Sequence, residues 1–125
     1  MKVENQEHRR EKRHPVHWPV AIVFESTEDQ DIYHGVTHDL SVTGCAILTE
    51  HNVFSDQPVS ILLSAPTDRP GGRRIIVEIR ARMVYTVLSA GHRKFRCGIQ
   101  FLKFKGSGRA TLTRKLAVRA FAGHS

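Results

Sequence analysis

Apolar and polar residues alternate along most of the chain, with the period of two that is typical of strands packed against a core on one face. The first such run covers residues 16–25, and Pro19 within it indicates a sheet edge or a bulge. Its apolar face would consist of Val16, Trp18, Val20, Ile22 and Phe24. The later runs cover residues 32–40, 43–49, 59–64, 75–87 and 95–101. The pattern therefore predicts a series of strands along the chain.

Turn-forming residues separate these runs, and no helical pattern lies between them. The segment 68–72, DRPGG, has the strongest turn chemistry in the chain. Strands that follow one another through turns alone predict an all-β fold, an antiparallel barrel or sandwich. We expect a barrel, since closure removes exposed sheet edges. On the long strand 75–87, Tyr85 and Val87 would continue the apolar face, while Glu78, Arg80, Arg82 and Thr86 would face water.

The two ends of the chain differ from the middle. Residues 1–14 form a polar, basic arm, and Pro15 separates it from the first strand because proline restricts the preceding residue to extended conformations. Residues 109–121 lack glycine and proline, so we expect a helix there, after a hinge at residues 106–108. Its apolar stripe would consist of Leu112, Leu116, Ala117, Ala120 and Phe121, and its solvated basic face of Arg114, Lys115 and Arg119. This predicts a flexible arm over residues 1–14 and one barrel domain with its helix over residues 15–125.

Composition fits a single domain. The chain has 125 residues, of which 40% are hydrophobic and 25% charged, and no apolar run is long enough to span a membrane. The N-terminus lacks the apolar segment of a secretory signal, and two cysteines are too few for a disulfide framework. We therefore expect a cytoplasmic protein with no membrane insertion.

Positive charge is concentrated in the last third of the chain. The formal net charge is +7, and residues 79–125 contain 11 Lys or Arg and no Asp or Glu. Such a surface first of all keeps a protein soluble. A more specific explanation of this charge is recognition of phosphate groups in a nucleotide, a nucleic acid or a lipid headgroup.

No motif predicts catalysis or a metal centre. The eight histidines form no HExxH or helical HxxxH pattern, and His34 and His38 on one strand would lie about 13 Å apart. His38 and Asp39 are adjacent, so we expect their side chains on opposite faces of a strand. Cys45 and Cys97 have no activating surroundings and are expected in the core. The sequence predicts no enzyme, no metal and no cofactor.

Two short motifs have complementary chemistry. The first is RxxxR, formed by Arg9 and Arg13, with Arg10 as an additional arginine inside it. Guanidinium groups match phosphate oxygens or the O6 and N7 atoms of guanine in bidentate fashion. The second is DxSxxG, formed by Asp39, Ser41 and Gly44 at a turn between two predicted strands.

In the second motif, an ionised Asp39 can accept the N–H groups of a guanine edge, and Ser41 can donate and accept. Gly44 would permit a positive φ and a close backbone approach. Either motif alone has an ordinary structural explanation: a basic arm, or a turn in which Asp39 and Ser41 satisfy local N–H groups.

Taken together and in this order, the motifs resemble the PilZ domain family. The segment EKRHPVHWPVAIVF resembles the entry into the first strand of the family, HDLSVTGCAIL its central turn, and FRCGIQFL its last strand. The resemblance implies a six-stranded antiparallel β-barrel with a C-terminal helix that binds the bacterial second messenger cyclic di-GMP.

The resemblance also implies roles for individual residues. Arg9 and Arg13 would contact phosphates and guanine, Arg10 could stack on a base, and Asp39, Ser41 and Gly44 would hold a guanine edge. Binding would order the N-terminal arm across the barrel, and an effector protein of a motility, secretion or exopolysaccharide system would recognise the changed surface. Whether one ligand or a stacked pair binds stays open.

Two other functions remain as alternatives. An OB-like barrel could bind nucleic acid by stacking bases on Trp18, Phe95 and Phe101, although these residues fall on apolar strand faces where a core position is expected. A protein-interaction domain could carry both motifs for structural reasons alone.

Overall fold

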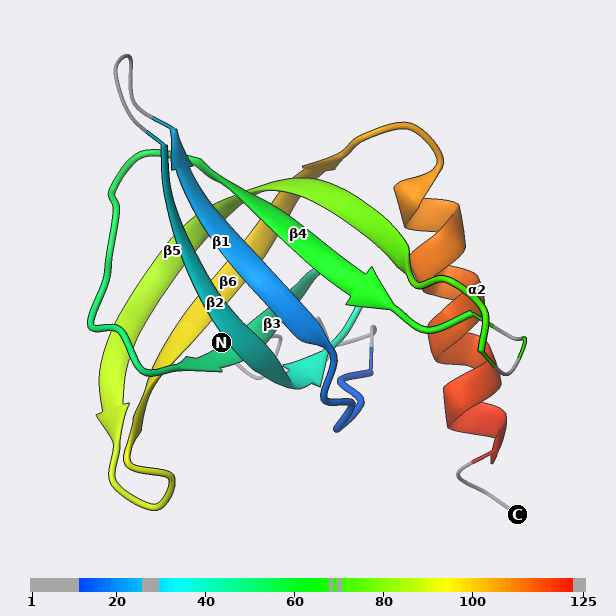
Figure 1. Ribbon diagram of the computed structural model, residues 1–125, viewed down its shortest axis with the longest axis horizontal. Helices are drawn as coiled ribbons and strands as arrows, with labels where there is room; N and C mark the ends of the chain where they lie inside the picture. Colours follow the sequence, from blue (N-terminus) through cyan, green and yellow to red (C-terminus); the bar gives the residue numbers. More distant parts are fainter. Residues whose placement is uncertain (1–11, 26–29, 68, 70, 123–125) are drawn as a thin grey trace, which may run out of the picture.

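A computed structural model describes residues 12–25, 30–67, 69 and 71–122 of the chain. The strands are β1 (Pro19–Glu25), β2 (Gln30–Leu40), β3 (Gly44–Thr49), β4 (Val59–Ala65), β5 (Ile75–Ser89) and β6 (Lys94–Phe104), and helix α2 (Gly108–Ala122) follows them. They form a closed barrel in the order β1-β2-β3-β6-β5-β4, with α2 along one side (Figure 1). The predicted six-stranded antiparallel barrel and its C-terminal helix are confirmed.

Every strand contributes to one core inside the barrel. Its largest fully buried strand side chains include Ile22, Leu40, Ile47, Ile61, Leu63 and Ile79. Cys45 and Cys97 lie among them as free thiols, and burial raises the pKa of both. The expected core position of the two cysteines is confirmed, and both thiols are held in their unreactive protonated form.

The chain enters the barrel differently from the prediction. β1 begins at Pro19 and not at Val16, yet Val16 and Trp18 are already buried. The side chain of Thr37 on β2 holds this entry segment: its hydroxyl donates to the carbonyl of Val16 at 2.5 Å and accepts the N–H of Trp18 at 2.9 Å. Ala21 and Val23 on the other face are buried as well, so both faces of β1 are shielded from solvent.

The alternation predicted for β5 is correct only up to Met83. The register between β5 and β6 shifts between Met83 and Tyr85, which makes Val84 an extra, bulged residue. Beyond the bulge the faces are exchanged. Thr86 is half-buried, with its hydroxyl donating to the carbonyl of Val53, whereas Tyr85 and Val87 are exposed. The predicted faces of these three residues are therefore wrong.

Helix α2 packs against β5 through a stripe that differs in part from the predicted one. Leu112 and Leu116 are buried as expected, but Ala117 is exposed and Lys115 is only 8% exposed. The buried face follows Gly108, Leu112 and Lys115, and the long alkyl stem of a lysine suits such a position. The side chains of Arg119, Ala120 and Phe121 lie outside the described part of the chain.

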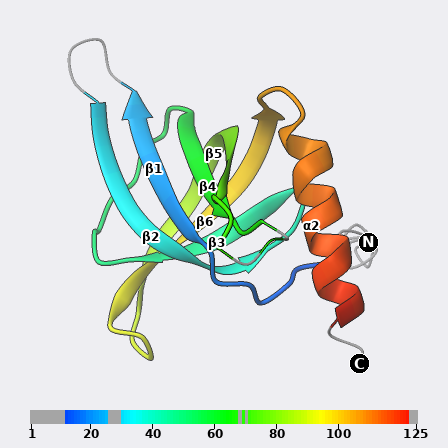
Figure 2. The ribbon, with the colours of Figure 1, turned by 45° about the vertical axis from the view of Figure 1, so that its right-hand side comes forward.

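Figures 1 and 2 show that the far end of the β5–β6 hairpin extends beyond the barrel, away from α2. Among the described residues, no helix is both long enough and apolar enough to cross a membrane.

Replacing Thr37 by valine should destabilise the protein, because the change leaves the N–H of Trp18 and the carbonyl of Val16 without their buried partner. Leaving a buried polar group unsatisfied costs about 1–3 kcal/mol, so we expect a loss of that order in the free energy of unfolding, measured with urea. Thr113→Val on the exposed face of α2 is the matched control, with an expected change within about 0.5 kcal/mol. Equal stability of the two variants would contradict the role given to Thr37.

Candidate functional site

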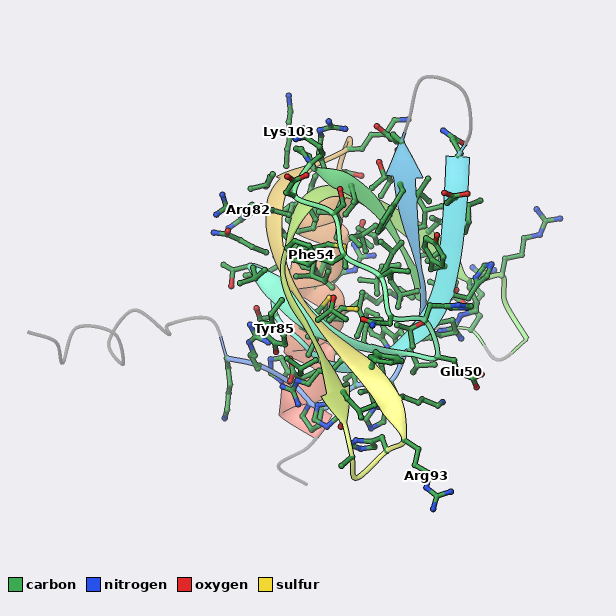
Figure 3. All side chains as sticks on the ribbon, turned by 90° about the vertical axis from the view of Figure 1, so that its left-hand side faces the viewer. Glu50, Phe54, Arg82, Tyr85, Arg93 and Lys103 are labelled. Atoms are coloured by element: carbon green, nitrogen blue, oxygen red, sulfur yellow. The ribbon has the colours of Figure 1, made fainter. Side chains whose placement is uncertain are left out.

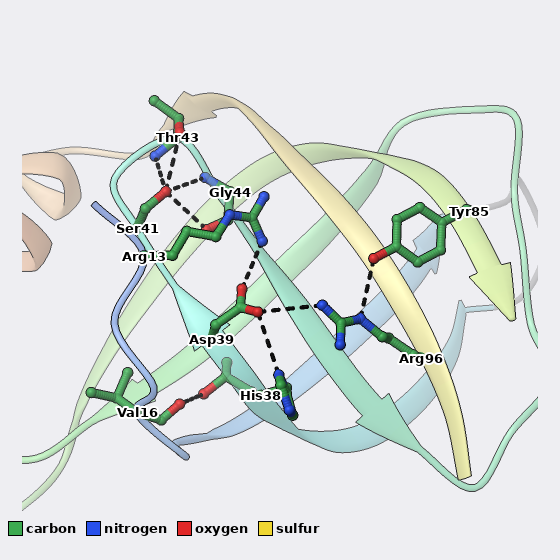
Figure 4. Close-up of polar contacts among 10 residues, drawn as sticks. Arg13, Val16, His38, Asp39, Ser41, Thr43, Gly44, Tyr85 and Arg96 are labelled. Carbon is green, nitrogen blue, oxygen red and sulfur yellow. Dashed lines mark hydrogen bonds and ion pairs between the residues drawn. The ribbon is translucent and has the colours of Figure 1, made fainter. Parts of the chain in front are cut away.

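Arg13, the last residue of RxxxR, lies beside DxSxxG on the outer face of the barrel. The chain at His14 pairs with the end of β2: the N–H of His14 donates to the carbonyl of Leu40 at 2.8 Å, and the N–H of Leu40 to the carbonyl of His14 at 2.9 Å. This pairing sets Arg13 beside Asp39, whose carboxylate accepts a hydrogen bond from the Arg13 guanidinium at 2.6 Å (Figure 4). One residue of RxxxR therefore contacts one residue of DxSxxG directly.

A bulge at His38 determines where Asp39 points. The register of β2 against β3 shifts between Thr37 and Asp39, so His38 is the extra residue. His38 and Asp39 consequently lie on the same side, with 3.4 Å between Nδ1 and Oδ2. The expectation that the two side chains point to opposite faces is wrong, because it assumed regular alternation.

The sequence reasoning missed two further residues of this cluster. The Arg96 guanidinium on β6 reaches the second Asp39 oxygen at 3.5 Å and donates to the hydroxyl of Tyr85 at 3.2 Å (Figure 4). Alternation along β6 places Arg96 on the outer face next to buried Cys97. The pairing of β6 with β3 brings Arg96 near Asp39. A local sequence pattern does not predict this long-range contact.

The charge of Asp39 is stabilised by its neighbours. Partial burial pushes the pKa of the Asp39 carboxyl up, but the hydrogen bonds from Arg13 and His38 and the positive charges of Arg13 and Arg96 outweigh it, so this pKa is lowered. The Asp39 side chain is 17% exposed and that of Arg13 38% exposed. The site thus presents an ionised acceptor between two guanidinium groups at the surface.

Ser41 shapes the turn between β2 and β3. Its buried hydroxyl accepts the N–H groups of Thr43 at 3.1 Å and Gly44 at 3.2 Å, and lies 3.3 Å from the Gly44 carbonyl. These are the local turn contacts that a serine in such a motif can make. In this structure the Ser41 side chain is engaged within the turn, while Asp39 faces its charged neighbours.

Gly44 is required for close packing of β3 against β6. A Cβ atom at this position would collide with the backbone carbonyl oxygen of Ile99 on β6. The close backbone approach that Gly44 permits is made in this structure to the protein's own strand β6. Gly44 is not among the described glycines with a positive φ, so this freedom of a glycine is not used here.

The outer face beside Asp39 is lined by small residues. Asp39 pairs with Ala46 on β3, Ala46 with Gly98 on β6, and Gly98 with Tyr85 on β5. The Tyr85 ring occupies the space that a side chain at Gly98 would need. The result is a row across four strands with a carboxylate at one end and an aromatic ring at the other.

Three histidine rings gather next to this row. The His38 ring lies 6.4 Å from that of His17 and 5.5 Å from that of His92, centre to centre. The Nδ1 atoms of His17 and His92 face the Thr37 carbonyl and the Ser89 hydroxyl, both at 3.0 Å. In the part of the chain that the structure describes, no three His, Cys, Asp or Glu side chains are arranged to hold a metal ion.

The remaining candidate residues lie elsewhere. Arg9 and Arg10 are outside the described residues. Trp18 is buried, and Phe101 packs against the core beside Phe104, so neither ring offers a free surface for base stacking. A shallow pocket of about 250 Å³ lies apart from Asp39, lined by Glu25, Ser60, Glu78, Arg80, Lys103, Phe104 and Lys105. Its carboxylates are already paired, Glu25 with Arg80 at 3.1 Å and Glu78 with Lys105 at 3.6 Å.

Lowering the pH should remove the stability that ionised Asp39 contributes. Its folded-state pKa lies below the ordinary value of 3.8, so this contribution is complete above that value and is lost as the pH falls through the folded-state pKa. We therefore expect the free energy of unfolding, measured with urea from about pH 6 to about pH 2.5, to fall less steeply in Asp39→Asn than in the wild type.

Glu25 provides the background for that comparison. Hydrogen bonds from Ser60 and Arg80 lower its pKa too, so it contributes a loss of the same sign in both proteins. Parallel curves for wild type and Asp39→Asn would show that the Asp39 cluster does not favour the carboxylate in the folded state.

Gly44→Ala should destabilise the barrel because the added methyl group meets the Ile99 carbonyl. Overpacking of this kind costs about 1–3 kcal/mol, measurable by urea unfolding. Gly91→Ala is the control: nothing lies within 4 Å of the position of its Cβ atom, and the change should stay within about 0.5 kcal/mol. A neutral Gly44→Ala would mean that β3 and β6 can move apart at low cost.

The fold is similar to that of several solved structures. The chain matches the inhibitor of motility MotI/DgrA of Bacillus subtilis with a TM-score of 0.72 and 13% identity, over 91% of this chain and 51% of that one. YcgR of Escherichia coli in complex with c-di-GMP gives a TM-score of 0.65 and 13% identity, over 93% and 47%. The PilZ domain of YcgR with c-di-GMP gives a TM-score of 0.59 and 14% identity, over 91% of this chain and 93% of that one. The chain spans about half the length of the first two proteins.

Sequence comparison identifies the family. No curated protein sequence matches the chain as a relative. The family model described as PilZ domain matches residues 7–117, which include RxxxR, DxSxxG and all six strands. The chain belongs to the PilZ domain family.

Proposed function

We propose that this PilZ domain binds cyclic di-GMP at the Asp39 cluster and acts as a receptor, not as an enzyme. The observation that carries the proposal is the contact between Arg13 and Asp39, which joins the two motifs at one surface site. Membership of the family supports it, as do two similar structures that contain c-di-GMP, those of YcgR and of its PilZ domain.

Each residue type at the site has a matching group in the ligand. The Asp39 carboxylate can accept N–H groups of a guanine edge, and the guanidinium groups of Arg13 and Arg96 can donate to phosphate oxygens. We assign Arg9 and Arg10 to the same ligand as further phosphate and base contacts. Ser41 and Gly44 act by holding the turn that carries Asp39.

Binding requires an exchange of partners. Arg13 now satisfies one oxygen of Asp39, the group that a guanine would bind. In the proposed complex Arg13 turns from the carboxylate to a phosphate, and the guanine edge takes its place on Asp39. The segment before Arg13 then lies across the barrel, and an effector protein of a motility, secretion or exopolysaccharide system recognises this surface. We place this exchange in the cytoplasm.

Calorimetric titration with cyclic di-GMP tests the proposal, with GTP as the ligand control. We expect saturable binding whose stoichiometry distinguishes one ligand from a stacked pair. Loss of a charge-assisted hydrogen bond is worth about 1.5–3 kcal/mol, so Arg13→Ala and Asp39→Ala should each weaken binding by about tenfold or more. Arg96→Gln should weaken it in the same direction.

Arg80→Gln is the matched control, because Arg80 is also a surface arginine paired with a carboxylate but lies outside the Asp39 cluster. It should bind like the wild type. A folded wild type that produces no heat with cyclic di-GMP would refute the function. Normal binding by both Arg13→Ala and Asp39→Ala would refute the site. Binding of single-stranded DNA that survives Asp39→Ala and weakens steeply with salt would favour the nucleic-acid alternative.

A further inference from the structure

We propose that the outer face of the β5–β6 ribbon is a docking site for a protein segment that combines acidic and aliphatic side chains. This ribbon face is defined by Arg82, Val84, Val87, Leu102 and Lys103. The proposal goes beyond nucleotide binding and does not depend on it. Figure 3 shows Lys103, Arg82 and Tyr85 following one another along this side of the barrel, with Arg93 at the end of the hairpin.

Two bulges bring aliphatic side chains to the ribbon face. The register between β5 and β6 shifts once between Met83 and Tyr85 and once between Arg80 and Ala81. The extra residues are Val84 on β5 and Leu102 on β6, and their side chains are 56% and 50% exposed. Bulges re-aim side chains at functional surfaces and are rarely accidental. Val87, beyond the first bulge, is 49% exposed and adds a third apolar side chain.

Positive charge surrounds these apolar side chains. Arg82 donates a hydrogen bond to the neutral amide of Gln100 at 2.6 Å, which leaves its charge without compensation from that partner. Lys103 pairs in register with Arg80 on the neighbouring strand. Glu25 and Glu78 line a pocket with Arg80, Lys103 and Lys105, so the cations there outnumber the carboxylates by three to two. Beyond Glu78, β5 and β6 contain no Asp or Glu. The ribbon face therefore attracts an acidic partner.

The positive charge and the aliphatic surface of the ribbon face together select the partner. A second copy of the chain would place like charges against each other. A nucleic acid would satisfy the charges but has no group that requires Val84 and Leu102. A lipid surface would bind through the hairpin end, where Leu88 is 65% exposed next to the turn of Ala90, Gly91, His92 and Arg93, and would not require Val84 and Leu102 further along the ribbon. A protein segment with carboxylates beside aliphatic side chains matches both features, and arginine is a residue type enriched at protein interfaces.

Selection from a random peptide library displayed on phage tests the proposal. Peptides of about twelve residues span roughly 40 Å when extended, enough to follow the ribbon. Selection uses the complete chain, with counter-selection on the variant Val84→Ser/Val87→Ser/Leu102→Ser. The enriched peptides are then measured by fluorescence anisotropy at about 0.15 M salt, where weak surface attraction is screened. The control variant is Val118→Ser, which changes an equally exposed valine on α2.

We expect enriched peptides that contain Asp or Glu together with Leu, Ile or Val. They should bind the wild type and Val118→Ser alike, and the triple variant at least about fivefold more weakly, as for loss of apolar interface contacts. Arg82→Glu should abolish their binding and serves as the second variant if circular dichroism shows that the triple variant does not fold. Enrichment that is equal on wild type and triple variant, or peptides without acidic residues, would overturn the proposal. The proposal would also be overturned if oligothymidylate, or vesicles of phosphatidylserine and phosphatidylcholine, bound the protein in a way that depends on the same three aliphatic residues.

Discussion

The insertion of β6 between β3 and β5 is the contact on which both the barrel and its candidate site depend. It closes the sheet, and it brings Arg96 within reach of Asp39 on one side and of Tyr85 on the other. The insertion is possible only because the strands approach closely at two glycines. Gly44 leaves room for the Ile99 carbonyl, and Gly98 leaves room for the Tyr85 ring. The same packing that completes the core therefore arranges the charged groups on its outer side.

Much of the fold could be predicted from the sequence, because strand positions depend on local alternation of apolar and polar residues. The order of the strands in the barrel could not be predicted, since the pairing of β6 with β3 joins residues about fifty positions apart. Bulges are the second feature that could not be predicted from the sequence. A single extra residue at His38 or Val84 exchanges the faces of everything beyond it, and that change leaves no local signature. Asp39, Arg13 and Gly44 were identified from motifs, whereas Arg96 and Tyr85 could be identified only from the register.

The surface position of the Arg13–Asp39 pair suits it to exchange partners. A buried ion pair is difficult to break, because each charge left behind is poorly solvated. Exposed pairs contribute only about 0–1 kcal/mol, and here Arg13 is 38% and Asp39 17% exposed. The protein would therefore lose little free energy when this pair separates to bind a ligand that offers a phosphate to Arg13 and N–H donors to Asp39. Until then, the pair keeps the carboxylate ionised and its acceptor oxygens oriented.

The bulges of the three strands have one consequence in common. Regular alternation assigns side chains to a core face and a water face, and selection for stability acts on the core face. Each bulge here adds a side chain to the outer face: His38 joins Asp39, Val84 lies beside Tyr85, and Leu102 lies beside Lys103. Beyond the bulges at His38 and Leu102, Leu40 and Phe104 still contact the core, whereas β5 contributes no core residue after Met83. Single-residue insertions in the strands of such a barrel can thus change the chemistry of its outer surface while the side chains that precede the insertion keep their places in the core.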